Sequence, residues 1–352
     1  MDVPRPSLSK YLLISENSID SSKPLGRSNQ VQKKSITIIC PVYNEEAVIL
    51  AFYQELKRVL DALKQSYSFT ILFVADKGTD RTWDILRGLG GKDPSVKALF
   101  LSSRFGHQAS LLAGLDFASS AAAIMMDSDL QHPPSLIPTL LQKYEGGANV
   151  VHTVKVDNAK APLRDRFVSY LFYRFMAVMA ETPIIPHASD FRLIDKRVIE
   201  IFRTDLRERN IFLRGLMSWI GFRQEFVPFE VSKRYSGKSK YSFAKMLSFA
   251  ITGVTSFSSR PLRLAIYLGL MTSLLGLVLL IYTYVSYYTG KVVAPGWASI
   301  LSVLTFFSGV QLVVLGVLGE YVGRVFFEVK NRPHYFVEHG VNIRTQIQRG
   351  NE

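Results

Sequence analysis

The chain has 352 residues, enough for one large domain or two smaller ones. It carries a formal net charge of +13 although 48% of its residues are hydrophobic, and a soluble nucleic-acid-binding protein is rarely this apolar. We therefore expect a membrane rather than nucleic acid among its partners. The single cysteine, Cys40, excludes an internal disulfide and is typical of a reducing compartment.

The N-terminal segment, residues 1–34, is polar and rich in Ser, Pro and Lys. Its longest apolar stretch, YLLI, is too short for the hydrophobic region of a signal peptide. We expect this segment to be mobile or loosely docked.

Short apolar runs rich in β-branched residues alternate with helical periods after residue 34. The runs predict strands at 35–40, 69–75, 96–101, 122–126 and 150–156. The helical periods lie at 45–64, 80–89, 106–119 and 135–145. This alternation indicates βαβ units. The sequence therefore predicts an α/β domain over residues 35–230, with a mostly parallel sheet covered by helices.

Polar clusters follow four of the predicted strands. PVYNEE follows the first strand, Asp76 the second, SSRFGHQ the third, and Asp127 with Asp129 the fourth. In parallel sheets, ligands bind beyond the C-terminal ends of the strands. We therefore expect these clusters to meet in one site. We expect His107, Gln108 and His132 to belong to a helix start and a turn rather than to that site.

The stretch MDSDLQHPP points to a metal site. Two carboxylates one residue apart repel each other unless a cation lies between them. Asp127, Asp129 and Gln131 offer oxygen ligands suited to Mg²⁺ or Mn²⁺. The alternative is an Asp-rich turn or helix cap before two prolines. The position of the stretch after a buried strand, beside the other clusters, favours the metal.

Two apolar runs, residues 264–288 and 298–323, predict membrane-spanning helices. Each exceeds the about 20 residues that a helix needs to cross a bilayer. Their short link carries only Lys291, whereas the outer ends are flanked by several Lys and Arg residues. By the positive-inside rule, we expect a cytoplasmic (inner) membrane protein with both termini, including the tail at 324–352, in the cytosol.

Two further segments look suited to the membrane surface. Residues 231–263 contain seven Lys and Arg residues without an acid and lead directly into the first span. Residues 163–180 interleave Arg with aromatic residues at near-helical spacing. A solvated basic face is the alternative. Beside two spans, we expect contact with anionic headgroups, and the exposed sides of a two-helix anchor permit a homo-oligomer.

Six motifs in order carry a family resemblance: CPVYNEE, VADKGTDRTWDIL, SSRFGHQASLLAGLDFA, MDSDLQHPP, SDFRLIDKRVIE and KRYSGKSKYSFAKML. They resemble the family 2 glycosyltransferases of GT-A fold. Together with the two spans, residues 35–330 resemble the polyisoprenyl-phosphate glycosyltransferases, the group of bactoprenol glucosyltransferase and dolichol-phosphate mannosyltransferase. The resemblance implies a GT-A domain and inverting transfer from a nucleotide sugar.

The resemblance also implies roles for single residues. The expected nucleotide-sugar site comprises Pro41, Tyr43, Glu45, Ala75, Asp76, Arg104 and Asp127. The expected metal ligands are Asp127, Asp129 and Gln131, and the expected catalytic residues are Asp127, Asp129, Asp157, Asp190 and Arg192. One position departs from the family, which usually has two acids where this chain has Ala75 and Asp76. We expect Ala75 to weaken turnover.

The acceptor implied by the resemblance is a lipid phosphate. A phosphate monoester is largely dianionic near neutral pH, since its second pKa is about 6, so it needs cations more than a general base. Candidate cations are Arg104, Lys155, Arg192, Lys238 and Lys240. Asp190 and Asp157 are candidates to orient the substrates. For Asp190, an ion pair with Arg192 or a helix cap is the alternative.

These expectations lead to one predicted activity and two alternatives. The predicted enzyme transfers a hexose, glucose from UDP-glucose, to undecaprenyl phosphate, for export and glycan modification such as that of lipopolysaccharide O-antigen. A processive polysaccharide synthase is the first alternative, but Arg214 and Trp219 are spaced too far apart for its QxxRW motif. A non-catalytic binder of nucleotide or lipid phosphate is the second, supported by Ala75.

Overall fold

In a computed structural model, the described residues are 33–156, 185, 188–209, 211–230, 258–289 and 296–343. The expectations for the N-terminal segment, for the helix at 163–180 and for most of the basic segment at 231–263 lie outside these residues.

The described part of the chain forms an eight-stranded sheet with the order β7-β5-β6-β4-β1-β2-β3-β8. Parallel pairs join β1 to β2, β1 to β4, β2 to β3 and β5 to β7, whereas β6 runs antiparallel to β4 and β5, and β8 antiparallel to β3. The strands are β1 (Lys34–Val42), β2 (Tyr67–Ala75), β3 (Val96–Leu101), β4 (Ala122–Met125), β5 (Val150–Lys155), β6 (Ala188–Asp195), β7 (Gln224–Phe229) and β8 (Val337–Val341).

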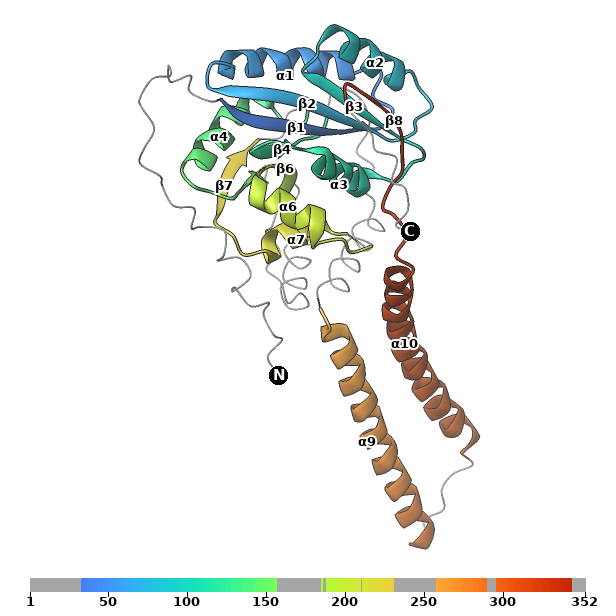
Figure 1. The fold of residues 1–352 in the computed structure, drawn as a ribbon. Helices are drawn as coiled ribbons and strands as arrows, with labels where there is room; N and C mark the ends of the chain where they lie inside the picture. The colour runs from blue at the N-terminus through green and yellow to red at the C-terminus, as the bar shows by residue number, and fades with distance from the viewer. Residues whose placement is uncertain are drawn as a thin grey trace, which may run out of the picture. The chain divides into compact units, whose positions relative to one another are not determined.

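Helices cover both faces of the sheet (Figure 1). On one face, α1 (Ile49–Leu63), α2 (Thr82–Lys92) and α4 (Ile137–Glu145) pack over one buried cluster. On the other, α3 (His107–Phe117), α6 (Lys196–Thr204) and α7 (Leu213–Trp219) pack over a second. In α1 the buried positions recur every three or four residues, as expected of an amphipathic helix. The predicted α/β fold is confirmed.

All five predicted strands are present, but β6, β7 and β8 were not predicted. The sequence of β6, ASDFRLID, carries three charged residues, Asp190, Arg192 and Asp195, and all three are buried. Apolar and polar residues alternate only over residues 190–193, and the charged side chains are buried because they pair with one another and with residues of other elements. The pattern of hydrophobicity therefore cannot identify it.

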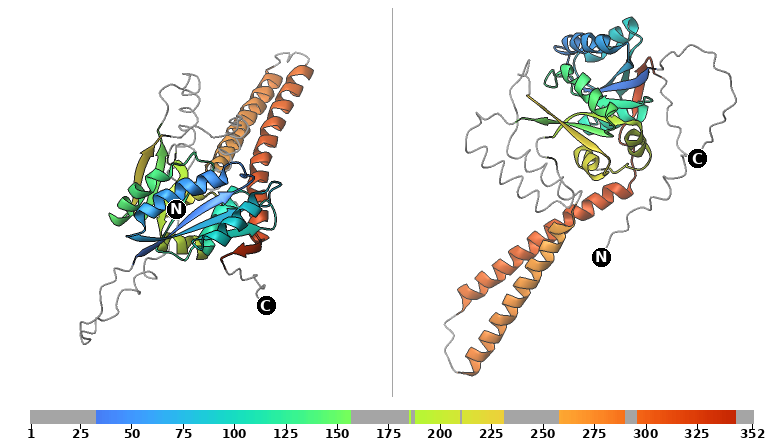
Figure 2. Two further views of the ribbon diagram at one scale, coloured as in Figure 1. Left: turned by 90° about the horizontal axis from the view of Figure 1, so that it is seen from above. Right: turned by 90° about the vertical axis from the view of Figure 1, so that its left-hand side faces the viewer.

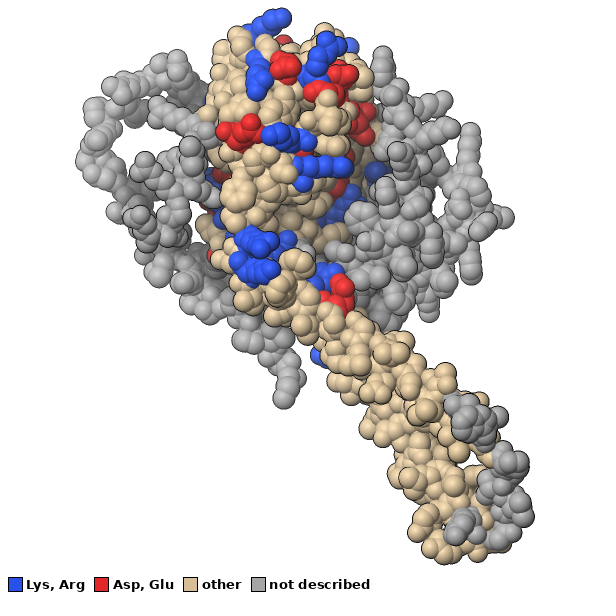
Figure 3. All heavy atoms as spheres, turned by 90° about the vertical axis from the view of Figure 1, so that its right-hand side faces the viewer, with Lys and Arg blue, Asp and Glu red and all other residues tan. Residues whose placement is uncertain are grey.

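Two long apolar helices follow, α9 (Arg260–Tyr288) and α10 (Trp297–Val329). They run side by side in every view (Figures 1 and 2). Both are long and apolar enough to cross a membrane, and at most 11% of their most apolar stretch is buried, unlike a core helix of a soluble domain. On the face shown in Figure 3, described charged residues are missing over most of the hairpin's length. The hairpin is consistent with membrane association.

After α10 the chain returns to the α/β domain. Strand β8 pairs with β3 at the sheet edge, and His339 stacks on Phe100 with ring centroids 4.5 Å apart. Next to β8, the Tyr335 hydroxyl donates a hydrogen bond of 2.7 Å to Asp116 Oδ2, and Arg207 Nη1 lies 2.7 Å from Asp116 Oδ1. The chain beyond the hairpin is thus held by the sheet edge and by a half-buried carboxylate of α3.

The hydrogen bond between Tyr335 and Asp116 generates a stability prediction. A hydrogen bond to a charged group contributes about 2 kcal/mol, so Tyr335→Phe should lower the free energy of unfolding by roughly that amount. Thermal denaturation of the detergent-solubilised protein measures the change. In a double-mutant cycle, Asp116→Asn should make the loss from Tyr335→Phe clearly smaller. Additive losses would show that the two side chains do not interact.

Candidate active site

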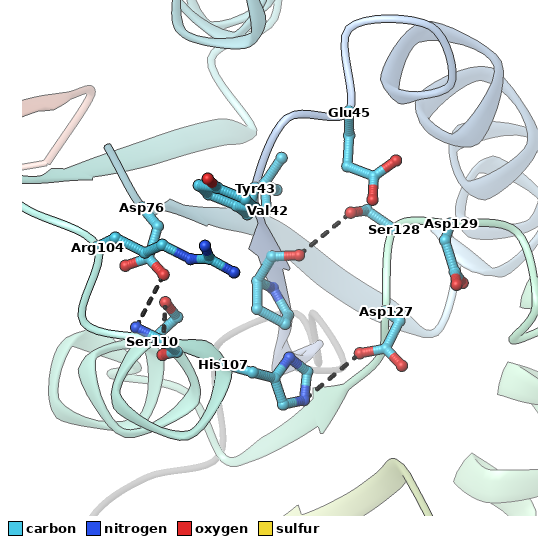
Figure 4. Close-up of a pocket in the computed structure, with 12 residues that line it drawn as sticks. Val42, Tyr43, Glu45, Asp76, Arg104, His107, Ser110, Asp127, Ser128 and Asp129 are labelled. Carbon is cyan, nitrogen blue, oxygen red and sulfur yellow. Dashed lines mark hydrogen bonds and ion pairs between the residues drawn. The ribbon is translucent and has the colours of Figure 1, made fainter. Parts of the chain in front are cut away.

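A cavity of about 310 Å³ lies beyond the C-terminal ends of β1, β2 and β4 (Figure 4). It opens at the edge where the polar clusters of the sequence were expected to meet. Its lining residues are Pro41, Val42, Tyr43, Glu45, Asp76, Arg104, Gly106, His107, Ser110, Asp127, Ser128 and Asp129.

One wall of the cavity is built around Asp76. Its carboxylate accepts hydrogen bonds from the backbone N–H groups of Phe105, at 3.1 Å, and of Gly106, at 2.9 Å. Gly106 has a φ of 93°, a conformation that favours glycine, and it immediately precedes α3. Asp76 therefore fixes the turn that begins α3 and also faces the cavity. The same wall carries Arg104, whose guanidinium lies 4.1 Å from the ring centroid of Tyr43.

The opposite wall carries Asp127 and Asp129. Ser128 between them is buried, and its hydroxyl donates a hydrogen bond of 3.1 Å to the Pro41 carbonyl. The backbone N–H of Gln131 donates to Asp129 Oδ1 at 3.0 Å. These bonds hold the stretch after β4 so that both acids line the cavity (Figure 4).

The acids of this wall fit a divalent cation shared with a substrate. Within the described ranges, no three His, Cys, Asp or Glu side chains cluster closely enough to enclose a metal. Mg²⁺ commonly binds proteins through one or two carboxylates and completes its coordination with substrate phosphates and water. Asp127 and Asp129 can supply the carboxylates. Gln131 is half-buried and is not among the lining residues.

His107 lines the cavity and lies between Asp127, which also lines it, and Asp190, which is buried behind it. Its Nε2 lies 3.6 Å from Asp127 Oδ1 and 3.4 Å from Asp190 Oδ2. Burial disfavours the charged ring, but the hydrogen bond to Asp190 and the charge of Asp127 outweigh it and raise the pKa of His107. His107 does begin α3, as expected, yet the expectation that it stays out of the site is wrong. Its place in SSRFGHQ, after the third strand, was the available signal.

Asp190 is a buried carboxylate held by two arginines. Arg214 bonds it through Nε at 2.9 Å and Nη2 at 2.7 Å, and Arg192 Nη2 lies 3.2 Å away. Burial alone would raise the pKa of Asp190, but the bonds from Arg214 and His107 lower it well below its usual range. A carboxylate in this state is a poor proton acceptor. The structure therefore matches the alternative interpretation of Asp190 as an ion-pair partner of Arg192. The sequence did not predict that Arg214 also pairs with Asp190.

Two expected site residues lie away from the cavity surface. Arg192 is 1% exposed, and its guanidinium also donates to the Ser189 carbonyl at 2.7 Å, so it supports Asp190 rather than contacting a ligand. Ala75 is fully buried in the core cluster beneath α1 and α2, so its side chain does not reach the cavity. Its placement gives no reason to expect weakened nucleotide binding.

The remaining expected residues do not line the cavity or lie outside the described residues. Lys155, at the end of β5, is half-buried and does not line the cavity. Gln108, expected only to begin a helix, accepts a hydrogen bond from the Leu213 backbone at 3.2 Å and so anchors the start of α7, next to Arg214. Asp157, Lys238 and Lys240 lie outside the described residues.

Comparisons with known proteins agree with this architecture. Residues 37–202 match the family Glycosyl transferase family 2, and residues 260–325 match the GtrB C-terminal hairpin. The chain is 39% identical over 311 residues to the uncharacterized glycosyltransferase YkcC of Bacillus subtilis, covering 88% of this chain and 95% of YkcC. It is 36% identical over 307 residues to a prophage-derived bactoprenol glucosyl transferase of Shigella flexneri, covering 86% of this chain and 97% of that protein.

One solved structure is similar only at the level of fold. Glucosyl-3-phosphoglycerate synthase from Mycobacterium tuberculosis, crystallised with Mn²⁺, UDP and glucosyl-3-phosphoglycerate, is 16% identical with a TM-score of 0.40. The match covers 63% of this chain and 78% of that one.

A GT-A sheet with an acidic cavity beyond its parallel strands, followed by an apolar hairpin, defines a glycosyltransferase with a membrane-associated part. The alignments extend over nearly the full length of the relatives. The chain belongs to glycosyl transferase family 2.

The raised pKa of His107 generates a pH prediction. Protonated His107 stabilises the fold below its ordinary pKa of about 6.5, and this contribution is lost as pH rises through the higher folded pKa. His107→Gln should therefore lower the apparent Tm more at about pH 6 than at about pH 8, measured with EDTA and without nucleotide.

His334 provides the matched control for this experiment. Burial lowers the pKa of His334, so its neutral form stabilises the fold and that contribution is lost as pH falls. His334→Gln should therefore lower the apparent Tm more at the higher pH. The same trend for both histidines would contradict the assignment of His107.

Proposed function

We propose that the enzyme transfers glucose from UDP-glucose to undecaprenyl phosphate with inversion at the anomeric carbon. The observation that carries the proposal is the alignment with a protein named bactoprenol glucosyl transferase. It covers 86% of this chain and 97% of that relative, and so spans both the acidic cavity and the hairpin. A match confined to the α/β domain would support only a sugar transferase of unspecified acceptor.

The cavity offers a site for the nucleotide sugar. Asp127 and Asp129 would hold Mg²⁺ or Mn²⁺ on one wall, and Tyr43 with Arg104 forms a flat cationic surface on the other. When bound, the metal would neutralise charge that develops on the diphosphate as the sugar leaves. Arg104 adds a positive charge on the donor side, and Asp76 keeps the turn beside it in place.

The acceptor chemistry suits the groups around Asp190. A phosphate oxygen attacks the anomeric carbon from the face opposite the diphosphate, the bond from that carbon to the UDP oxygen breaks, and its electron pair leaves with UDP. Because the phosphate is already ionised, no side chain has to remove a proton. The low pKa of Asp190 agrees with a structural role for this acid. Arg214, with 41% of its side chain exposed, presents positive charge beside His107.

The hairpin supports a place in the cytoplasmic membrane, where a polyisoprenyl lipid resides. We propose a multi-pass topology with the α/β domain and both termini in the cytosol. Arg260 and Arg263 at the start of α9, and Lys330 and Arg332 after α10, lie at the ends expected to face anionic headgroups. The exposed apolar faces of the hairpin would allow self-association. The product would be a lipid-linked glucose used to modify a glycan such as lipopolysaccharide O-antigen.

Transfer from radiolabelled UDP-glucose to undecaprenyl phosphate tests the proposal. The purified enzyme with Mg²⁺ or Mn²⁺ should add one glucose per lipid, and EDTA should stop the reaction. Asp129→Ala should lower the rate at least about 100-fold, since it removes a carboxylate that holds the metal.

Asp84, an exposed acid of α2 with 70% of its side chain accessible, gives the control variant. Asp84→Ala should transfer glucose at the wild-type rate. A long polymer would favour a processive synthase instead. Absence of transfer with every nucleotide sugar would favour a non-catalytic binder.

A further inference from the structure

His132 is buried between the two halves of the site. It lies in the stretch after β4, and only 2% of it is exposed. Its Nδ1 accepts a hydrogen bond of 2.9 Å from the Asp127 backbone N–H, and its Nε2 lies 2.7 Å from Ser189 Oγ. Ser189 immediately precedes Asp190. One ring therefore joins the backbone that presents Asp127 to the strand that presents Asp190.

The two partners define which nitrogen of His132 carries the proton. A backbone N–H can only donate, so Nδ1 must be unprotonated. The proton is therefore on Nε2, which donates to the Ser189 hydroxyl oxygen. Nδ1 also lies 3.5 Å from Asp127 Oδ2, a longer contact with the same residue. The neutral ring thus acts as a directional link with one acceptor end and one donor end.

Aromatic side chains keep the His132 ring in this orientation. Phe191 stacks on it with centroids 5.3 Å apart, and Phe229 meets it edge-on at 6.1 Å. Phe191 belongs to β6 and Phe229 to β7, so the ring is enclosed by the strands beyond β4. Rotation of the imidazole would break both hydrogen bonds and open this packing.

We infer that His132 is a positioning residue that sets the separation between the donor side of the site, at Asp127, and the acceptor side, at Asp190 and Arg214. The inference rests on the proposed function for its kinetic consequence. His107 spans the same gap through side chains alone, whereas His132 bonds the backbone N–H of Asp127 on one side and the short Ser189 side chain, next to Asp190, on the other. A shift of about 1 Å between reacting groups can cost about 100-fold in rate.

Two substitutions test separately the hydrogen bond from His132 to Asp127 and the one from His132 to Ser189. In His132→Asn, an amide oxygen can take the place of Nδ1 and accept from Asp127, but the side chain is too short to reach Ser189. In His132→Gln, the amide can reach Ser189, but the acceptor for the Asp127 N–H is lost. We expect His132→Gln to raise the KM for UDP-glucose about tenfold. His132→Asn should leave this KM within about twofold and lower kcat about tenfold, because only the acceptor side is released.

His152 offers a matched control within the same sheet. It is fully buried on β5, its Nε2 lies 3.1 Å from Gln224 Oε1, and it stacks on Phe226 at 5.5 Å. The same two substitutions at His152 should lower the apparent Tm while leaving both KM and kcat near wild type. If the His132 variants changed KM and kcat together, as general loosening of the core would, the inference would be overturned.

Calorimetric binding of UDP with Mn²⁺ keeps this test separate from the proposed activity. His132→Gln should weaken UDP binding about tenfold and His132→Asn should not, whether or not the wild type transfers glucose. If the wild type transferred no glucose but UDP binding were weakened only in His132→Gln, the proposed function alone would be rejected. Equal UDP affinity in wild type and both variants would reject the positioning role alone.

Ser189→Ala covers the case in which the His132 variants do not fold. It removes the outer partner of the ring with little change in volume. We expect a kcat about tenfold lower at an unchanged KM for UDP-glucose. An unchanged kcat would overturn the inference.

Discussion

The site depends on the compensation of one buried negative charge. Asp190 is buried near the start of β6, an inner strand of the sheet, where an unpaired carboxylate would cost several kcal/mol. Arg192 and Arg214 offset that cost from two different elements, β6 and α7, and His107 of α3 completes the set. Because these charges are mutually dependent, they fix the relative positions of a strand and two helices. The cluster that we propose to face the acceptor is therefore built into the core of the fold.

The topology of the sheet explains why this cluster meets Asp127 and Asp129. Strand β6 runs antiparallel to β4, with Met125 opposite Arg192. The start of β6 consequently lies beside the end of β4, where Asp127 and Asp129 follow. A parallel neighbour would have brought its C-terminal end to this position instead. The antiparallel strand thus adds its own acid and arginine to an edge already lined by the parallel strands. His132 joins the segment after β4 to the start of β6.

The residues proposed to bind the donor could be predicted from sequence, and the contacts on the proposed acceptor side largely could not. Tyr43, Asp76, Arg104, Asp127 and Asp129 each follow a strand whose apolar pattern is evident, so their convergence is a consequence of a parallel sheet. The acceptor side depends on pairings between distant residues. Arg214 and Asp190 are 24 positions apart, and Ser189 and His132 are 57 apart. Strand β8 is similarly hidden, because its pairing with β3 is long-range and the sequence around it shows no alternation.

The central claim is that an ionised lipid phosphate attacks the sugar directly, with the carboxylates of the site serving the metal and the arginines. Direct displacement inverts the anomeric configuration, whereas a carboxylate nucleophile would retain it through two displacements. Proton NMR of the purified glucosyl lipid measures this configuration. From α-linked UDP-glucose, the account predicts a single β-linked glucose in phosphodiester linkage. An α-linked product would contradict it.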